Sequence, residues 1–278
     1  MPFIKENKII LPSVTKFASK YEILAEVEGY RHASKTGLKT AKLLHWSENA
    51  ISVEHITGIS CFRYLQLLDD NDQEKKKAIL NILISDVLKF QSSGFEKMII
   101  FSPYPVKEKA EEILDVMNRV RHPFRKILSK KLSYIQNTYI NYATVPFRDA
   151  NPKNTLLNNV SEDNFSYKSN SDLINAIRHI DFRSVSELTT NYDDIISILY
   201  HYQISEDIRS VLINDYGLNT NNEEFLVTLF VRMGRFWSRR IYYLLENKAL
   251  FNTRYKFENL DFYSRQFNQI IDRIIRMF

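Results

Sequence analysis

The 278-residue sequence contains only one cysteine and six glycines. The single cysteine, Cys61, excludes an internal disulfide and any zinc site built from several cysteines, which fits a reducing compartment. No glycine occurs before Gly29, so the N-terminal segment lacks the residue that best allows close backbone approach to a ligand. No apolar run is long enough for a membrane span, and the N-terminus lacks a signal-peptide pattern. We therefore expect a cytoplasmic protein without a membrane span.

The composition is that of a globular protein, with 44% hydrophobic and 13% aromatic residues. The formal net charge of +5 is modest. However, the segment from Val231 to Phe278 holds ten basic and four acidic residues, so the remainder is slightly acidic. Solvated helix faces are one interpretation of this segment, and a surface for an anionic ligand is the other.

The N-terminal part of the chain reads as short strands followed by a helix. The three expected strands cover Pro2 to Lys5, Lys8 to Leu11 and Val14 to Ala18. Ser19 and Glu22 then form the pattern of a capping box, in which each residue satisfies a free amide of the other. Together with apolar residues at helical spacing, this pattern predicts a helix from Lys20 to about Ala33.

The helical wheel of this segment decides which carboxylate faces inward. Ile23 and Val27 lie at the centre of the apolar stripe, Glu26 borders it, and Glu28 points away. Lys16 is the residue of the preceding strand that would meet an inward carboxylate. The alternative is that both Lys16 and Glu26 are solvent-exposed charges.

The rest of the chain begins with a hairpin and then becomes mainly helical. The hairpin is expected from Lys42 to Leu44 and from Ala50 to Glu54, and an extended segment closes on Gly58. The expected helices cover Asn71 to Gly94, Glu108 to Val120, Phe124 to Asn137, Asp194 to Ile204, Asn222 to Leu245 and Asp261 to Phe278. Asn158 to Asp172 reads as an exposed loop, and Ala176 to Phe182 as a strand. This order indicates a small sheet-rich lobe and a larger helical lobe, divided near Gly58.

The segment from Val145 to Leu157, V-P-F-R-D-A-N-P-K-N-T-L-L, sets Asp149 and Asn154 five positions apart. That spacing is typical of a phosphoryl-transfer loop, where Asp orients a hydroxyl and Asn binds magnesium. Asp, Asn and Pro also make up ordinary surface turns. The spacing alone therefore leaves both interpretations open.

Taken in order, the segments V-T-K-F-A, L-A-E-V-E-G-Y, S-V-E-H-I-T-G, F-R-D-A-N-P-K-N-T-L-L and I-D-F-R resemble the aminoglycoside phosphotransferase and choline kinase group. The resemblance covers roughly Val14 to Leu199. It implies an α+β, protein-kinase-like two-lobe fold with a short, trimmed β-rich N-lobe and a larger, mainly helical C-lobe. The implied parts are an N-lobe at 1–58 with a hinge at 53–58, a C-lobe at 59–278, a catalytic loop at 147–157 and a metal-binding segment at 180–183.

The resemblance also implies cofactors, ATP and Mg²⁺, and roles for individual residues. Lys16 would hold the α- and β-phosphates, and Glu26 would orient that lysine. Asp149 would orient or deprotonate the hydroxyl of the acceptor. Asn154 and Asp181 would bind magnesium, which prefers oxygen ligands and keeps several waters.

Further residues of the implied site lie in the hinge and under the nucleotide. The carbonyl of Glu54 and the amide of Ile56 would face the adenine, and Leu156 would lie beneath the ring. Asp194 resembles the buried aspartate that braces the catalytic loop.

The sequence departs from the family pattern at several positions. The phosphate-covering turn would fall on Lys5-Glu6-Asn7, which contains no glycine. Phe147 replaces the usual histidine of the loop and is expected in the core. Arg148 replaces a glycine and would neutralise either a phosphate or a nearby acid. These departures keep open the alternative of a catalytically impaired, nucleotide-binding or regulatory pseudokinase.

The acceptor is expected to be a small molecule with a hydroxyl group. A protein kinase is disfavoured because Asn151 stands two positions after Asp149, and only twelve residues separate Asp181 from Asp194, which leaves no room for a peptide-docking segment. The basic C-terminal part suits an anionic or sugar-like acceptor better than a polycationic aminoglycoside. The candidate acceptor residues are Arg148, Asn151, Arg239 and Arg240. Nucleic acid is a less favoured partner that the interleaved arginines and aromatic residues leave open.

Overall fold

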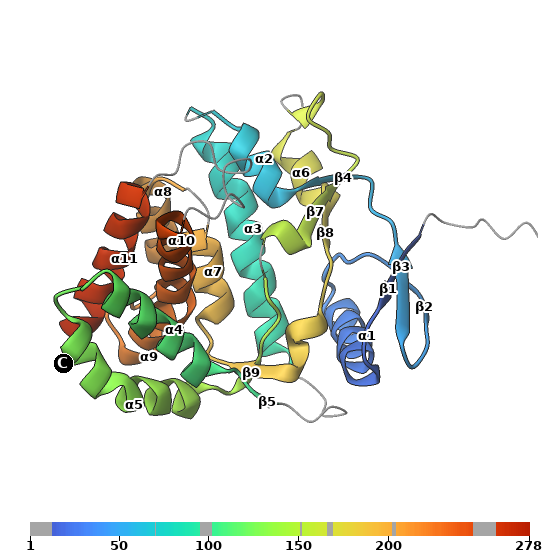
Figure 1. The fold of residues 1–278 in the computed structure, drawn as a ribbon. Coiled ribbons are helices and arrows are strands. Elements are labelled where there is room, and N and C mark those ends of the chain that lie inside the picture. The colour runs from blue at the N-terminus through green and yellow to red at the C-terminus, as the bar shows by residue number, and fades with distance from the viewer. Residues whose placement is uncertain are drawn as a thin grey trace, which may run out of the picture.

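The structure is a computed structural model (Figure 1), and it describes residues 13–69, 71–94, 102–150, 152–165, 169–201, 204–246 and 260–278. The expected strands Pro2 to Lys5 and Lys8 to Leu11, the expected phosphate-covering turn at Lys5-Glu6-Asn7 and the candidate acceptor residue Asn151 lie outside these ranges.

A three-stranded antiparallel sheet and one helix form the N-terminal layer, on the right in Figure 1. Its strands are β1 (Ser13–Phe17), β2 (Leu43–Trp46) and β3 (Ala50–Glu54), in the order β1-β3-β2. In this register Lys16 of β1 pairs with Ile51 of β3. The expected strand and hairpin are therefore present within a residue or two at each end.

Helix α1 (Lys20–Lys35) packs against this sheet. Its capping box forms as expected, because the Ser19 side chain accepts from the Glu22 amide and the Glu22 carboxylate accepts from the Ser19 amide. The buried face includes Ile23, Val27 and Tyr30. Burying each such side chain contributes about 1.5–3 kcal/mol, so the apolar stripe rather than helix propensity holds α1 in place.

The second sheet joins the chain after β3 to the centre of the molecule. It contains β4 (Gly58–Ser60), β7 (Thr155–Asn158) and β8 (Ile177–His179), all antiparallel, in the order β4-β7-β8. A Cβ atom at Gly58 would lie 1.9 Å from the carbonyl oxygen of Leu157. Only glycine therefore allows β4 to approach β7 this closely.

A third, small sheet lies beside the helices. Its strands are β5 (Ser102–Pro103), β9 (Glu187–Thr189) and β6 (Val145–Pro146), in the order β5-β9-β6. β6 leads directly into the segment that contains Asp149, so this sheet fixes where that segment begins.

Helices make up the remainder of the described chain. Their bounds are α2 (Cys61–Leu67), α3 (Gln73–Ser92), α4 (Val106–Arg119), α5 (Arg125–Tyr142), α6 (Asn170–Ala176), α7 (Asp193–His201), α8 (Glu206–Asp215), α9 (Glu223–Leu229), α10 (Arg235–Leu245) and α11 (Leu260–Ile275). Short helical turns occur at η1 (Pro152–Asn154), η3 (Arg183–Ser186) and η4 (Phe230–Gly234), the last of which is a π-helical turn.

The helices differ from the sequence prediction at four places. α2 and α8 were not predicted. The segment expected as one helix from Asn222 to Leu245 is divided by η4 into α9 and α10. The expected loop from Asn158 ends early, because Ser169 and Asp172 form a capping box that starts α6.

Three apolar clusters hold these layers together. The first joins α1 and β3 to Phe90 and Phe182. The second surrounds α3 and the β7–β8 pair, and the third fills the space between the helices on the left of Figure 1. No helix in the described ranges is both long enough and apolar enough to span a membrane. The division into two lobes at residue 58 stays a prediction.

Candidate active site

Lys16 is the point at which three separate elements meet. Its Nζ atom lies 2.7 Å from Oε1 of Glu26 on α1 and 3.3 Å from Oδ1 of Asp181. The Glu26 side chain is 3% exposed, and burial raises its pKa while the hydrogen bond from Lys16 opposes that shift. Glu28 instead pairs with Arg31. The structure thus brings together the lysine, glutamate and aspartate that the sequence singled out, although their roles stay predictions.

Asp149 occupies an unusual backbone conformation. Its φ of 53° lies in the left-handed region, as does the φ of 62° at Asp181. Non-glycine residues in this region are uncommon, and such conformations cluster at functional sites. The Asn154 amide donates to the backbone carbonyl of Asp149 at 3.2 Å and to its Oδ2 at 3.3 Å. The side chain of Asn154 therefore fixes the turn that presents Asp149.

The β7–β8 pair explains how Asn154 and Asp181 come close despite their separation in sequence. Thr155 of β7 pairs with His179 of β8, and the amide of Ile180 donates to the carbonyl of Asn154 at 2.9 Å. Asn154 and Asp181 thus lie at the same end of this antiparallel pair. The hydroxyl of Tyr30 accepts from the Asp181 amide at 3.3 Å and links that end to α1.

A buried polar network connects β7 and β8 to α3. His179 Nε2 lies 2.8 Å from Oδ2 of Asp86 on α3, and its Nδ1 lies 3.1 Å from the Thr155 hydroxyl. Burial, followed by the charge of Arg148, lowers the pKa of His179 to about 4, against the opposing effect of Asp86. A neutral imidazole bonded on both sides supports the packing of β8 in this position.

Two oxygen-bearing side chains fit a magnesium ion at this end of the strands. Asp181 offers a carboxylate, and Asn154 retains its amide oxygen because its nitrogen is the atom that bonds Asp149. Magnesium is commonly bound by one or two protein oxygens, with phosphates and water completing its coordination. Within the described ranges, no group of three or more His, Cys, Asp or Glu side chains could hold a metal, so any such ion would depend on phosphates and water.

Arg232 is a site residue that the sequence did not single out for this role. It lies in the π-helical turn η4, and its guanidinium donates to Asp149 Oδ1 at 2.7 Å. The same guanidinium donates to the Tyr104 hydroxyl at 2.9 Å and to the Ser197 hydroxyl at 2.7 Å. Burial alone would lower the pKa of Arg232. The charge of Asp193 and the interactions with Tyr104 and Asp149 raise it by more than burial lowers it, so the group stays cationic.

The sequence held one weak signal for this contact. Arg232 belongs to the arginine-rich segment after Val231, but its pairing with Asp149 spans 83 residues. π-Helical turns are frequent at functional sites, yet they leave no mark in the apolar periodicity.

Asp194 supports the loop from the opposite side. Its Oδ1 accepts from the Ala150 amide at 2.7 Å, which is the bracing contact expected from the resemblance. The side chain is fully buried, and burial raises its pKa to about 6 although Arg148 opposes the shift. A charge in this position costs stability, which indicates that it is retained for the geometry of the loop.

Arg148 lies in the core and not on an acceptor surface. It is 3% exposed, with its guanidinium 5.5 Å from the ring centre of Phe90 and 6.0 Å from that of Phe182. Burial lowers its pKa, and the charges of Asp194 and Asp86 oppose this effect. Of its two expected roles, this surrounding favours the neutralisation of nearby acids. Phe147 is buried in the core, as expected.

The hinge residues border the N-terminal apolar cluster. Ile56 is buried in this cluster, and Leu156 packs against it from β7. The Glu54 amide donates to the carbonyl of Lys42 at 2.8 Å, which holds the end of β3. These positions are compatible with an adenine between Ile56 and Leu156, and their contacts with a nucleotide stay predictions.

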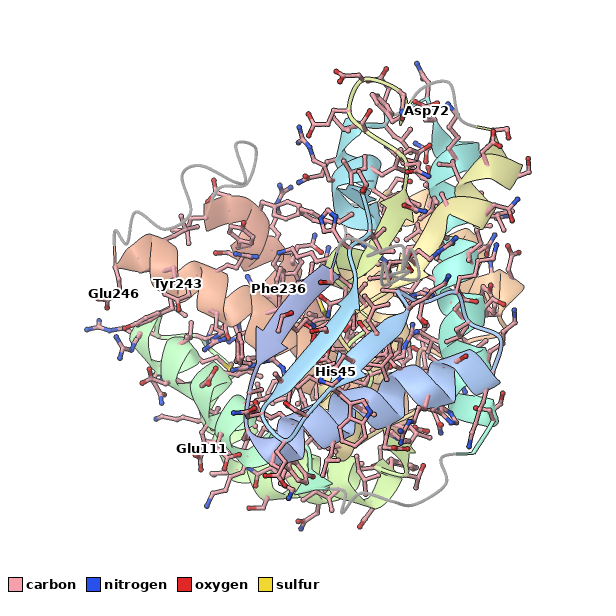
Figure 2. All side chains as sticks on the ribbon, turned by 90° about the vertical axis from the view of Figure 1, so that its right-hand side faces the viewer. His45, Asp72, Glu111, Phe236, Tyr243 and Glu246 are labelled. Carbon is pink, nitrogen blue, oxygen red and sulfur yellow. The ribbon has the colours of Figure 1, made fainter. Side chains whose placement is uncertain are left out.

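A cavity of about 320 Å³ opens beside Arg232. Among the described residues, its lining consists of four arginines and three aromatic residues, namely Arg232, Arg235, Arg239, Arg240, Tyr104, Phe236 and Tyr243. Figure 2 shows Phe236 and Tyr243 along α10, which packs next to α4. The candidate acceptor residues Arg239 and Arg240 thus belong to one cavity, which Arg232 connects to Asp149.

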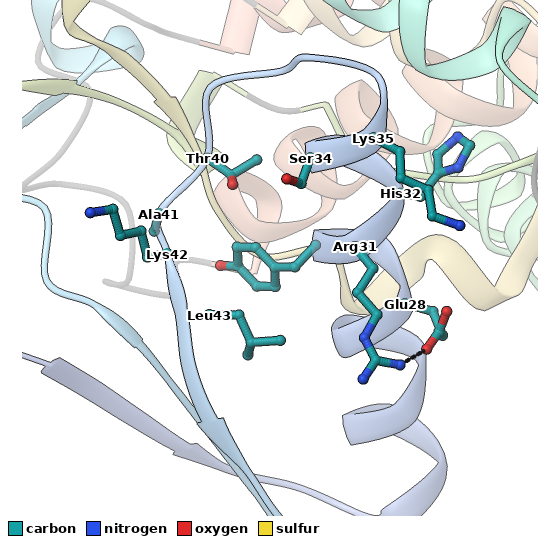
Figure 3. Close-up of a pocket in the computed structure, with 10 residues that line it drawn as sticks. Glu28, Arg31, His32, Ser34, Lys35, Thr40, Ala41, Lys42 and Leu43 are labelled. Atoms are coloured by element: carbon teal, nitrogen blue, oxygen red, sulfur yellow. Dashed lines mark hydrogen bonds and ion pairs between the residues drawn. The ribbon is translucent and has the colours of Figure 1, made fainter.

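A larger cavity, of about 680 Å³, lies between α1 and residues 40–43. Figure 3 shows Glu28 and Arg31 paired on one side of it and Lys42 on the other. None of the predicted site residues lines this cavity among the described residues. This cavity therefore lies apart from the predicted site residues.

A three-stranded N-terminal sheet with one helix, followed by a mainly helical part, is a protein-kinase-like fold of class α+β. The backbone is similar to that of a choline/ethanolamine kinase family protein from Mesorhizobium loti. The TM-score is 0.56 and the identity 11%, over 94% of this chain and 82% of that chain. It is also similar to the ADP-bound aminoglycoside phosphotransferase APH(2'')-Ib, with a TM-score of 0.52 and 11% identity over 96% and 88% of the two chains.

No protein-family model and no curated protein matches the sequence. The likeness to the two solved structures therefore concerns the fold, and it confirms the fold that the motifs predicted.

Proposed function

We propose that this protein is a phosphotransferase that uses ATP and Mg²⁺ to move the γ-phosphate to a hydroxyl group of a small molecule. The contact of Lys16 with both Glu26, at 2.7 Å, and Asp181, at 3.3 Å, carries this proposal. It joins a strand, a helix and the end of β8 around one ammonium group. Phosphoryl transfer requires mainly such positioning and charge neutralisation.

Each residue has a defined task in this proposal. Lys16 neutralises the phosphates, and Glu26 keeps its ammonium group in position. Asn154 and Asp181 hold magnesium, which neutralises charge on the phosphates. Asp149 orients the acceptor hydroxyl and takes its proton, while the acceptor oxygen bonds to the γ-phosphorus and the bond to the β-phosphate oxygen breaks. Glu54, Ile56 and Leu156 contact the adenine.

The acceptor in this proposal is an anionic or sugar-like molecule and not a polycationic aminoglycoside. The four arginines that line the cavity beside Asp149 support this choice, because they would repel a polycation. A cytoplasmic location remains a prediction, and nucleic acid remains a less favoured partner.

The alternative is a kinase-like protein that binds nucleotide without efficient transfer. The ion pair between Arg232 and Asp149, at 2.7 Å, favours this alternative, because it occupies Oδ1 of the carboxylate that would accept the proton of the acceptor hydroxyl. Arg232 would then have to give up this contact, or share it with an acceptor, before transfer can occur.

Two measurements test the proposal. A thermal-shift titration with ATP and Mg²⁺ should raise the melting temperature of the wild type but not of Asp181→Ala, with Asp163→Ala as an exposed control. Slow ATP hydrolysis by the wild type should disappear in Asp149→Asn. An equal thermal shift in wild type and Asp181→Ala would count against the proposed magnesium site. Normal binding without hydrolysis would favour the pseudokinase.

A further inference from the structure

Four guanidinium groups line this cavity, and two of them depend on a single acid. Arg235 makes two hydrogen bonds to Glu112, at 2.7 and 3.3 Å, and Arg239 lies 3.3 Å from the same carboxylate. One acid is therefore shared by two guanidinium groups. Arg240 lies with its guanidinium 4.4 Å from the ring centre of Phe236.

Lys109 on α4 lies beside the same arginines. Its ammonium group lies 3.2 Å from the ring centre of Tyr104, which lines the cavity. Burial and the charges of Arg235 and Arg232 lower the pKa of Lys109 to about 7, although Asp193 and Glu187 act in the opposite direction. This pKa lies near neutral pH, so an anion bound nearby would favour the protonated form of Lys109.

Arg232 connects the cavity to the proposed reaction. One of its nitrogens donates to Asp149 and another to Tyr104, so the same guanidinium borders both the carboxylate and the cavity. A group bound in the cavity would therefore lie next to Asp149. A volume of about 320 Å³ is at the lower end of the range for small-molecule sites, roughly 300–1,000 Å³, and excludes a large polymer as its content.

We propose that this cavity is the acceptor site and that the acceptor carries a phosphate-like dianion, held by Arg235 and Arg239, with Arg232 positioned between that anion and Asp149. This inference rests on the proposed phosphotransferase function. Guanidinium groups bind phosphate through pairs of parallel hydrogen bonds, which fixes orientation as well as charge. The aromatic rings of Phe236 and Tyr243 would contact the less polar part of the same molecule.

The dianion would orient the acceptor so that its hydroxyl reaches Asp149. Arg232 has further N–H groups besides those that bind Asp149, Tyr104 and Ser197. An anion that bonds to one of these remaining groups would share the positive charge of Arg232 with Asp149 and so weaken the ion pair between the two residues. Arg232 is thus a positioning residue whose contact with the base depends on the acceptor.

Sulfate is a suitable probe, because it is a dianion that does not titrate near neutral pH. Calorimetric titration of nucleotide-free protein with sulfate should show binding above that of acetate at equal ionic strength. Arg239→Gln should weaken sulfate binding about 10-fold or more, since it removes a charge-assisted hydrogen bond. The Arg239 side chain is 50% exposed, so this variant is expected to fold.

Two control variants separate this site from other cationic surfaces. Arg265→Gln makes the same charge change at an exposed position of α11 outside the cavity and should leave sulfate binding unchanged. Lys16→Gln should also leave it unchanged, because Lys16 belongs to the proposed nucleotide site. Equal sulfate affinity in wild type and Arg239→Gln, or a loss confined to Lys16→Gln, would overturn the inference.

Proton uptake gives a second readout. A bound dianion should return the proton to Lys109, so the binding enthalpy of sulfate at pH 7.5 should vary with the ionisation enthalpy of the buffer. Lys109→Met should abolish this variation. Failure of ATP binding with sulfate binding dependent on Arg239 would refute the proposed kinase function but not the anion site, whereas the reverse result would refute the anion site alone.

Discussion

Gly29→Ala is the substitution that most directly tests how α1 positions the site. Gly29 faces Phe182, the residue after Asp181, and an added Cβ would lie 2.4 Å from the Phe182 Cβ and 3.2 Å from its carbonyl oxygen. Carbon atoms normally pack about 3.5–4.0 Å apart. The helix and the Asp181 segment would therefore have to separate by roughly 1 Å.

The expected effect on stability is small because two terms oppose each other. Alanine in place of glycine inside a helix stabilises by about 1 kcal/mol, while overpacking of a filled site costs about 1–3 kcal/mol. The free energy of unfolding should thus fall by about 0–2 kcal/mol. Urea unfolding measures this quantity, and Ser34→Ala, at an exposed position of the same helix, is the control.

The expected effect on nucleotide binding is larger. Glu26 lies on α1 and Asp181 precedes Phe182, and Lys16 contacts both carboxylates. A separation of about 1 Å breaks this shared contact, and misplacement of that size can cost about 100-fold in rate. MgATP affinity should fall at least about 10-fold in Gly29→Ala and stay unchanged in Ser34→Ala. A more stable Gly29→Ala variant with unchanged MgATP affinity would refute this reasoning.

Two further substitutions test the buried acids Glu26 and Asp194. Glu26→Gln keeps an oxygen for Lys16 and removes a buried charge. We therefore expect a free energy of unfolding in urea within about 1 kcal/mol of wild type, together with weaker MgATP binding. A loss of more than about 3 kcal/mol in the free energy of unfolding would contradict this expectation. Asp194→Asn keeps an acceptor for the Ala150 amide. Because the folded-state pKa of Asp194 is about 6, above its unfolded value of 3.8, its protonated form favours the fold and this contribution is lost as pH rises from about 4 to 6. Relative to Asp194→Asn, wild-type stability in urea should therefore drop by up to about 3 kcal/mol between pH 4 and pH 7, and parallel pH profiles would refute the assignment.

Local patterns in the sequence determined the elements that carry the site. The Ser19–Glu22 capping box and the apolar stripe fixed α1 and turned Glu26 inward, because caps and helical periodicity depend on residues a few positions apart. The spacing from Asp149 to Asn154 marked this segment as a candidate site, and the structure adds the hydrogen bond between the two residues. The protein-kinase-like fold was predicted from the resemblance of five segments, in their order along the chain, to a known family, and the likeness to two solved structures confirms that fold.

Only the tertiary structure decided what surrounds Asp149. The segment from Asn222 to Leu245 reads as one continuous helix, but η4 interrupts it and brings Arg232 within 2.7 Å of Asp149. The left-handed backbone of Asp149 and Asp181 was likewise invisible in the sequence. Both features depend on how the helices pack, since a contact across 83 residues is set by the shape of the whole core and not by any local pattern.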